Sequence, residues 1–533
     1  MACPNGTVAA GHALSRSDLV AFATSCGVPE ALGQLRAAQV SKNKLLLAAV
    51  MRQATGSGRA ERALTDAYQL LREVERRDPA VLHDVVAAPQ FGAWATDSAR
   101  LLRGGGRGGE PLWTGPGHLA VHAAAAAFRA GIPFEIDVPQ RTGTVTFPGV
   151  GTARLEVAAP AEEWATVRND DRGGRVSTLA STVWVSRREN RGRGRDSAWS
   201  PEHHLSAEVS GLRLAVTLDC DDPFLDRYGA ARARLTRRDV AAWERVLTAA
   251  WRELAGSDRN LATLVARTVR VLVPVVAPAP TRFVSATDAW SFGAHAMSLP
   301  ADGLAMAEAL VHESQHAVLA AITELVPLVH DRKGILFYAP WREDPRPVGA
   351  LLQGVYPHYM ITRFWRGRRM TMAARGRLRC DVEFGRWRSQ TERAAGELAR
   401  SGALTEAGEA FIAAIRERLA GWRAEPVGEE ARGHIADVTV EHRARWRLRH
   451  LVPDEAGLAG LADAWCTGAR PSRPAAEVGA ALVPGPLPRV LDNARGYALA
   501  ARYSAPGTLR AIVDGGGTPR LDPADALLAT GRY

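Results

Sequence analysis

The segment from Ala305 to Val329 is the clearest helix in this sequence, because its apolar residues recur at helical spacing along its length. In its middle stands His312-Glu-Ser-Gln-His316. Residues four apart share one face of a helix, so two imidazoles there can bind one ion from the same side. The His-Glu-x-x-His pattern on a helix is typical of catalytic metal sites. We predict a divalent metal at His312 and His316; the alternative is two structural histidines that pack on a core helix.

Length and composition indicate a soluble globular protein with more than one core. The chain has 533 residues, of which 46% are hydrophobic and 23% charged, and this length exceeds what one compact core usually holds. No apolar run approaches the roughly 18 residues of a membrane helix, and no secretory signal is expected at the N-terminus. The five cysteines are scattered without a Cys-x-x-Cys pair, which favours a reducing cytoplasm.

The net charge of +10 comes almost wholly from arginine, since lysine stands only at positions 42, 44 and 333. Arginine in place of lysine, with abundant alanine and glycine, is typical of a GC-rich bacterial genome, so we expect a cytoplasmic bacterial protein. The arginines are spread along the whole chain, which weakens the case for a nucleic-acid partner. The run Arg103–Gly109 resembles an RNA-binding segment only in composition, because such segments work as long arrays. We predict one loop there.

Hydrophobic periodicity predicts an α+β chain that is mainly α-helical, with a helical metal-binding catalytic core and a small antiparallel β insertion. We divide it into a helical region at 1–135, a small β-containing region at 136–225, a helical catalytic region at 226–430 and a C-terminal region of helices and loops at 431–533. Strand pairs are expected at 142–147 with 152–157 and at 204–209 with 212–218. Helical segments are expected at 15–129, 237–254, 260–275 (helical or buried), 354–365, 389–401, 407–422 and 456–465. Arg188–Asp196 and the last 60 residues are expected to be loops.

The third metal ligand decides which chemistry the motif serves. In a zinc peptidase, the Glu next to the first His acts as general base on the metal-bound water. The third ligand that such a peptidase needs is missing here. Leu319 and Ile322 stand where one peptidase class requires Gly and His, Glu324 lies too close on the same helix, and Glu343 lies in a Pro-rich loop. A histidine is therefore the better candidate.

Two histidines follow the motif helix. His330 would lie about 20 Å from His316 if the helix stayed straight. His358 sits in a second helix-like segment, which could pack antiparallel to the first. Three histidines on one side of an ion suit ferrous iron or catalytic zinc. The alternative for His358 is a packed or capping histidine.

Four further runs follow the motif. They are, in order, Leu325-Val-Pro-Leu328, Tyr338-Ala-Pro-Trp-Arg-Glu-Asp-Pro-Arg-Pro347, Leu351-Leu-Gln-Gly-Val-Tyr356 and Arg363-Phe-Trp365. With these runs the chain resembles the His-Glu-x-x-His type of α-ketoglutarate-dependent peptide β-hydroxylases of bacterial ribosomal-peptide biosynthesis. The resemblance spans about residues 140–470 and is strongest over 305–366.

The resemblance implies an iron(II) enzyme that uses α-ketoglutarate and O2 to hydroxylate a β-carbon in a ribosomally made precursor peptide. It implies that His312 and His316 are iron ligands and that His358 is the third. Glu313 would then accept a hydrogen bond and orient a ligand rather than act as a hydrolytic base. The precursor peptide is the expected partner, with other enzymes of peptide maturation as further candidates.

A bound α-ketoglutarate also needs a cation for its distal carboxylate, and arginine can supply a bidentate clamp. The candidates are Arg342, Arg346 and Arg363, and Tyr338 and Gln353 are expected to line the pocket. The alternative for each arginine is a solvated surface charge, and for the other two ordinary core packing.

Two other functions stay open. The first is a zinc peptidase that trims the same kind of peptide with Glu313 as its base. The second is a non-catalytic scaffold that binds peptide through a decayed site. The metal and the need for α-ketoglutarate separate the two enzymes, whereas a protein that never takes up metal would indicate the scaffold. The sequence leaves open the target residue, the oligomeric state and the role of the N-terminal helices.

Overall fold

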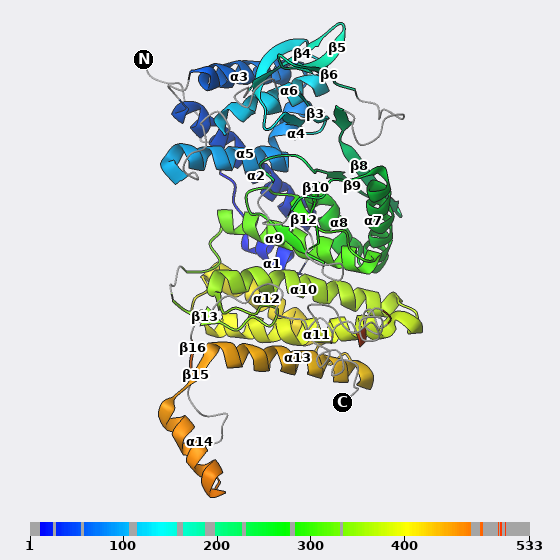
Figure 1. Cartoon of the computed structure of the whole chain (residues 1–533). Coiled ribbons are helices and arrows are strands. Elements are labelled where there is room, and N and C mark those ends of the chain that lie inside the picture. Colours follow the sequence, from blue (N-terminus) through cyan, green and yellow to red (C-terminus); the bar gives the residue numbers. More distant parts are fainter. Residues whose placement is uncertain are drawn as a thin grey trace. The chain divides into compact units, whose positions relative to one another are not determined.

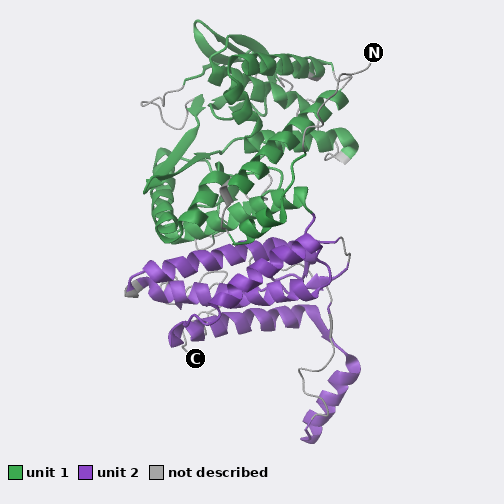
Figure 2. Cartoon of the chain, turned by 180° about the vertical axis from the view of Figure 1, so that it is seen from behind, with its two compact units in different colours: residues 1–326 green, residues 327–533 purple. Residues whose placement is uncertain are grey.

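The computed structural model describes residues 11–24, 28–54, 58–105, 115–156, 164–186, 198–225, 231–277, 283–330, 334–470, 480–482, 499, 502–503 and 507. The chain divides into two compact units, residues 1–326 and 327–533 (Figure 2). Helices predominate beside several small sheets (Figure 1), which confirms the predicted α+β, mainly α-helical fold class. Among the described helices, none has the length and apolar character needed to cross a membrane.

Helices fill the N-terminal part of unit 1, as predicted. They are α1 (Arg16–Thr24), α2 (Val28–Gln53), α3 (Arg59–Arg77), α4 (Pro79–Val86), α5 (Pro89–Arg100) and α6 (Leu119–Ala130), with the short turns η1 (Leu101–Gly105) and η3 (Pro116–His118). Local sequence sets their ends. Asp78 caps α4 by accepting the N–H groups of Ala80 and Val81, and Gly131 ends α6 with left-handed backbone at φ 66°.

The described part of unit 1 holds three sheets. The first is antiparallel, in the order β1 (Phe134–Pro139), β4 (Trp164–Asp170), β5 (Gly173–Ser177) and β6 (Thr182–Trp184). The second contains β2 (Thr144–Phe147), β3 (Gly151–Arg154) and β7 (Trp199–Pro201). The third has the order β11 (Ser285–Thr287), β12 (Ala294–Met297), β10 (Val271–Pro274), β9 (Leu212–Leu218) and β8 (His203–Val209). Both predicted strand pairs are confirmed, as β2 with β3 and β8 with β9.

The third sheet extends beyond the predicted β region and is mixed rather than purely antiparallel. Strand β10 pairs in parallel with both β9 and β12. The segment 260–275, expected as helical or buried, is partly a helix, α8 (Arg259–Thr268), and partly this strand. All four residues of Val271–Pro274 are buried. A parallel strand that is covered on both faces has a continuous apolar sequence. Periodicity alone cannot distinguish such a run from a buried helix.

The motif helix α9 (Gly303–Leu325) follows β12 in the chain and packs against α2, α7 (Arg237–Ser257), α8 and β11. Asp302 starts it by accepting the N–H of Ala305 at 2.7 Å. The helix ends four residues earlier than predicted, at Leu325. Pro327 accounts for this, because a proline disfavours helical backbone in the residue before it.

Gly303 allows the close approach of α9 to α7. A Cβ atom at this position would lie 2.7 Å from the Cβ of Ala249 and 2.9 Å from backbone atoms of Ala249 and Ala250. Backbone cannot move aside as a flexible side chain can, so we expect Gly303→Val to lower the free energy of unfolding by about 1–3 kcal/mol. Gly256→Ala on α7 is the matched control, since nothing lies within 4 Å of its Cβ position. Equal effects of both substitutions in urea unfolding would contradict this account.

Unit 2 is built mainly from helices. They are α10 (Val348–Thr371), α11 (Ala374–Arg400), α12 (Glu406–Trp422), α13 (Glu429–His450) and α14 (Glu455–Thr467). Two short strand pairs accompany them, β13 (Leu336–Phe337) with β14 (Arg346–Pro347) and β15 (Leu451–Pro453) with β16 (Ala480–Leu482). The helices predicted at 354–365, 389–401, 407–422 and 456–465 are confirmed, the first two as parts of longer helices. Helix α10 continues through Pro357.

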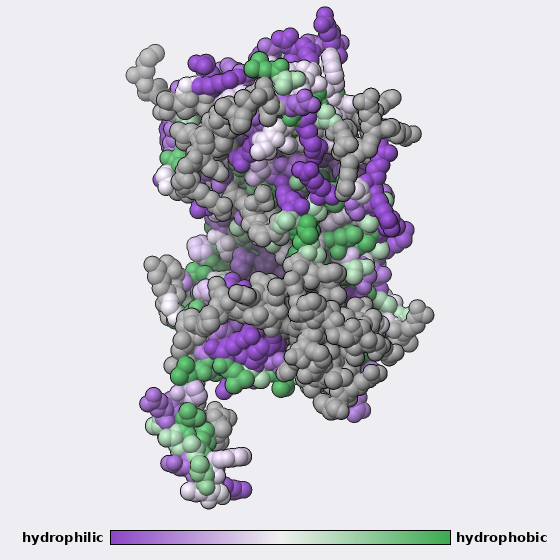
Figure 3. Space-filling model, viewed as in Figure 1, coloured by the Kyte–Doolittle hydropathy of each residue, from purple (hydrophilic) through white to green (hydrophobic). Residues whose placement is uncertain are grey.

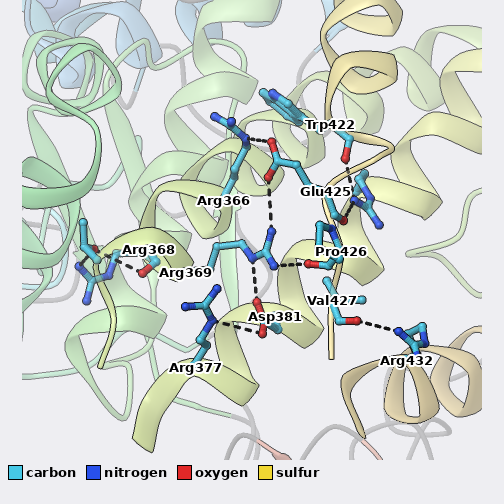
Figure 4. A network of polar contacts seen from close by, with 12 residues as sticks. Arg366, Arg368, Arg369, Arg377, Asp381, Trp422, Glu425, Pro426, Val427 and Arg432 are labelled. Carbon is cyan, nitrogen blue, oxygen red and sulfur yellow. Dashed lines mark hydrogen bonds and ion pairs between the residues drawn. The ribbon is translucent and has the colours of Figure 1, made fainter. Parts of the chain in front are cut away.

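A polar network lies between α10, α11 and the segment after α12 (Figure 4). At its centre is Arg369, whose side chain is 5% exposed. It donates to Asp381 at 2.7 Å and to Glu425 at 3.3 Å, and it also donates to the carbonyl oxygen of Pro426. Arg377 reaches the same Asp381 at 3.6 Å but is half exposed. The network therefore ties the α12–α13 connection to two long helices through one buried cation.

Some predictions fall outside the described residues. These are the loop at 188–196, residues 106–109 of the glycine-rich run, and nearly all of the last 60 residues. They stay predictions.

Candidate metal centre

The two motif histidines meet on one face of α9, as their spacing predicts. The Nε2 atoms of His312 and His316 lie 3.1 Å apart, and the rings are nearly perpendicular. Either one imidazole donates to the other, or both nitrogens face one cation, since a separation of this size lets both lie about 2.1 Å from the same ion. Burial lowers the pKa of His312 to about 4, with a further contribution from His316. His312 is therefore neutral at pH 7, as a metal ligand must be.

Glu313 points into a buried polar pocket beside strand β11. Its carboxylate accepts one hydrogen bond from the Ser285 hydroxyl and one from the Thr287 hydroxyl, each at 2.6 Å. Burial alone would raise the pKa of Glu313, but the nearby His312 and His316 and the two hydroxyls outweigh it and lower the pKa. The side chain is 3% exposed. Glu313 is thus an ionised carboxylate whose two oxygens are both occupied by hydrogen bonds.

His295 on β12 completes this pocket, and sequence reasoning missed it. Its Nδ1 lies 2.8 Å from the Thr287 hydroxyl oxygen. Because that hydroxyl gives its proton to Glu313, the Nδ1 of His295 must be the donor. Burial lowers the pKa of His295 to about 4, so it is neutral. No sequence motif in the segment 285–295 indicates that Ser285, Thr287 and His295 belong to the site. They come together beneath α9 only because β11 pairs with β12.

Thr287→Val is expected to disturb α9 more than Ser285→Ala does. The Thr287 hydroxyl bridges Glu313 and His295, so its loss leaves two buried polar partners, whereas the loss of Ser285 leaves one. An unsatisfied buried polar group costs about 1–3 kcal/mol. We therefore expect Thr287→Val to lower the free energy of unfolding by at least about 2 kcal/mol. This loss should exceed that of Ser285→Ala by the cost of about one unsatisfied polar group. Denaturant unfolding of both variants tests this order.

His358, the predicted third ligand, lies in unit 2 on α10. Its ring stacks on Trp341 with centroids 4.1 Å apart and contacts Trp387 at 4.7 Å. Its Nδ1 donates to the carbonyl oxygen of Gly354 at 2.8 Å. That hydrogen bond fixes a proton on Nδ1, so in a neutral imidazole Nε2 would be the nitrogen that binds a metal, as is usual in metal-binding histidines. The aromatic contacts are equally those of a packed core histidine, so its role as a ligand stays a prediction.

The arginines proposed for α-ketoglutarate also lie in unit 2. Arg342 and Arg346 both donate to Asp344, at 2.8 and 2.9 Å. Burial would raise the pKa of Asp344, but the two arginines lower it. The group of three carries a net charge of +1, which can still attract an anion. Arg363 is partly buried on α10.

The two residues expected to line the pocket are placed in unit 2 as well. The Tyr338 hydroxyl lies 2.9 Å from His442 Nδ1, and its ring packs on Trp446. Gln353 is partly buried on α10. The predicted residues thus fall into two groups, with His312, Glu313 and His316 in unit 1 and the others in unit 2.

No group of three or more His, Cys, Asp or Glu within the described ranges is arranged to hold a metal ion. The pair on α9 is therefore the part of the predicted centre that the structure brings together. Comparisons with models of known protein families and with curated proteins give no match for this chain.

Proposed function

We propose that this protein is an iron(II)- and α-ketoglutarate-dependent hydroxylase that acts on a residue of a ribosomally made precursor peptide. The proposal combines the resemblance of residues 305–366 to the peptide β-hydroxylases with the surroundings of the motif helix. The observation that carries it is the engagement of Glu313 by Ser285 and Thr287. A peptidase needs this carboxylate at the metal-bound water, whereas in a hydroxylase a buried, hydrogen-bonded carboxylate suffices.

The histidine pair on α9 fits two ligand positions of an iron centre of this kind. His312 and His316 would hold the metal through their Nε2 atoms, and His358 is the proposed third ligand, also through Nε2. Bound iron with α-ketoglutarate and O2 would supply the oxidising chemistry that replaces a C–H bond by C–OH, releasing succinate and CO2. Glu313 would hold α9 in place through β11, and its negative charge would favour a bound cation. Arg342 and Arg346 are the proposed partners of the co-substrate's distal carboxylate.

Substitution of Glu313 by glutamine separates hydroxylase from peptidase. In a hydroxylase we expect Glu313→Gln to reduce the iron-dependent conversion of α-ketoglutarate to succinate by about 10- to 100-fold, the range for a residue that orients a ligand. In a peptidase the same change removes the base and abolishes peptide cleavage. Glu324→Gln is the matched control, because Glu324 lies on the same helix and binds Lys42 and Gln39 at the surface. Zinc-dependent cleavage that is lost only in Glu313→Gln would overturn the proposal.

A further inference from the structure

Helix α14 exposes a row of large apolar side chains. Leu458, Leu461 and Trp465 lie on one face at helical spacing, and Leu458 is 52% and Trp465 88% exposed. Among the described elements of unit 2, none packs extensively on α14. Figure 3 shows apolar and polar residues side by side on this helix, which is identified by its place in Figure 1. Exposed apolar rows of this kind mark interaction surfaces.

Helix α13 carries a second exposed apolar row. Ala436, Val440, Ala444 and Leu448 follow one another at intervals of four and therefore form one ridge. Val440 is 66% and Leu448 86% exposed. The opposite side of α13 carries the buried Val438 and Trp446. The outer ridge is consequently a second face that the described part of unit 2 leaves uncovered.

The charges beside the two rows are opposite. Asp454 and Glu455 stand at the N-terminal end of the α14 row. The exposed Arg443 and Arg447 stand beside the α13 ridge. Opposite charges around apolar contacts favour one pairing over others. The two faces therefore complement each other in both hydropathy and charge.

Helix α14 cannot pack on α13 of its own chain while the connection between them stays in its strand pair. Only residues 451–454 separate the two helices, and Leu451–Pro453 is held extended in β15 by pairing with β16. Folding α14 back would break that strand pair. The same contact made between two copies needs no such change. Reciprocal exchange also closes with two-fold symmetry, which buries both rows of both copies.

We propose that the chain forms a homodimer in which α14 of each copy packs on the α13 ridge of the other. The two helices lie antiparallel, so that Trp465 packs near Val440, Leu458 packs near Leu448 and Glu455 lies toward Arg447. This inference does not depend on the proposed enzymatic function.

Light scattering of the full-length protein after size exclusion tests the dimer. We expect twice the monomer mass, and at least a 10-fold weaker dimer in Trp465→Glu and in Leu448→Glu. Arg447→Glu should also weaken it, and Glu455→Arg should restore it in the double variant. Trp184→Glu is the control, because Trp184 is 53% exposed on β6 in unit 1. A monomer at micromolar concentration, or a dimer unchanged by both substitutions on the rows, would overturn the proposal.

Crosslinking tests the arrangement. The native Cys466 is exposed on α14, so Val440→Cys should form an intermolecular disulfide with it on mild oxidation. The crosslinked dimer should be lost when Cys466→Ser is added. An intramolecular product instead would mean that α14 folds onto its own α13 and would contradict the exchange.

Discussion

Replacement of His312 by alanine is expected to weaken iron binding by more than about 100-fold while the protein stays folded. Loss of a residue that merely orients a ligand already costs about 10- to 100-fold in metal affinity, and His312 is proposed to touch the ion itself. The imidazole is neutral and partly exposed, so its removal leaves no buried charge. His316→Ala should behave alike, because the two Nε2 atoms face each other.

The iron content of the variant after anaerobic equilibration with Fe(II) measures this effect. Thermal unfolding of the same sample shows whether the protein stays folded. His330→Ala is the control, since His330 is exposed in unit 2 and its backbone N–H bonds Ala403. Iron content at the wild-type level in both His312→Ala and His316→Ala would show that the motif pair is a structural feature of α9.

Arg369→Ala is expected to cause the largest loss of stability, about 3–5 kcal/mol. Asp381 and Glu425 both bind this buried guanidinium, and removing one partner of a buried ion pair leaves uncompensated charge in the interior. The carbonyl of Pro426 loses its donor as well. Urea unfolding, followed by far-UV circular dichroism, reports the change.

Arg377→Ala provides the comparison for this prediction. Arg377 binds the same Asp381 at 3.6 Å, but its side chain is half exposed. Exposed ion pairs contribute between about 0 and 1 kcal/mol. A loss above 2 kcal/mol in Arg377→Ala, or a loss below about 1 kcal/mol in Arg369→Ala, would show that burial does not decide the strength of this network.

Periodic patterns predicted most of the helices, because each buries one face in a regular way. The pattern failed at Val271–Pro274, where a strand is covered on both sides and shows no alternation. It also failed at α13, which was not predicted. That helix carries arginines on several faces and an exposed apolar ridge, so no single apolar stripe marks it. Sequence periodicity therefore detects elements whose apolar residues lie on one face and misses those whose apolar residues lie on two.

Part of the candidate site could be predicted, and part could not. The spacing of His312 and His316 predicted that the two rings lie together on α9, because their proximity depends on helix geometry alone. The partners of Glu313, Ser285 and Thr287, both lie on β11, 28 and 26 residues before it in the sequence. Such contacts depend on sheet pairing, which a motif does not encode. Arg342 and Arg346 were predicted as clamps for the distal carboxylate of α-ketoglutarate, and the sequence did not reveal that both bind Asp344, which stands between them.

The proposed function rests on a ferrous site that binds α-ketoglutarate at His312 and His316. The most direct measurement is an anaerobic titration of the protein, reconstituted with Fe(II), with α-ketoglutarate in a visible spectrometer. We expect a weak charge-transfer band that requires both components and is absent in His312→Ala. No band in the wild-type protein, together with tight zinc binding and peptide cleavage that Glu313→Gln abolishes, would contradict the hydroxylase and identify a zinc peptidase.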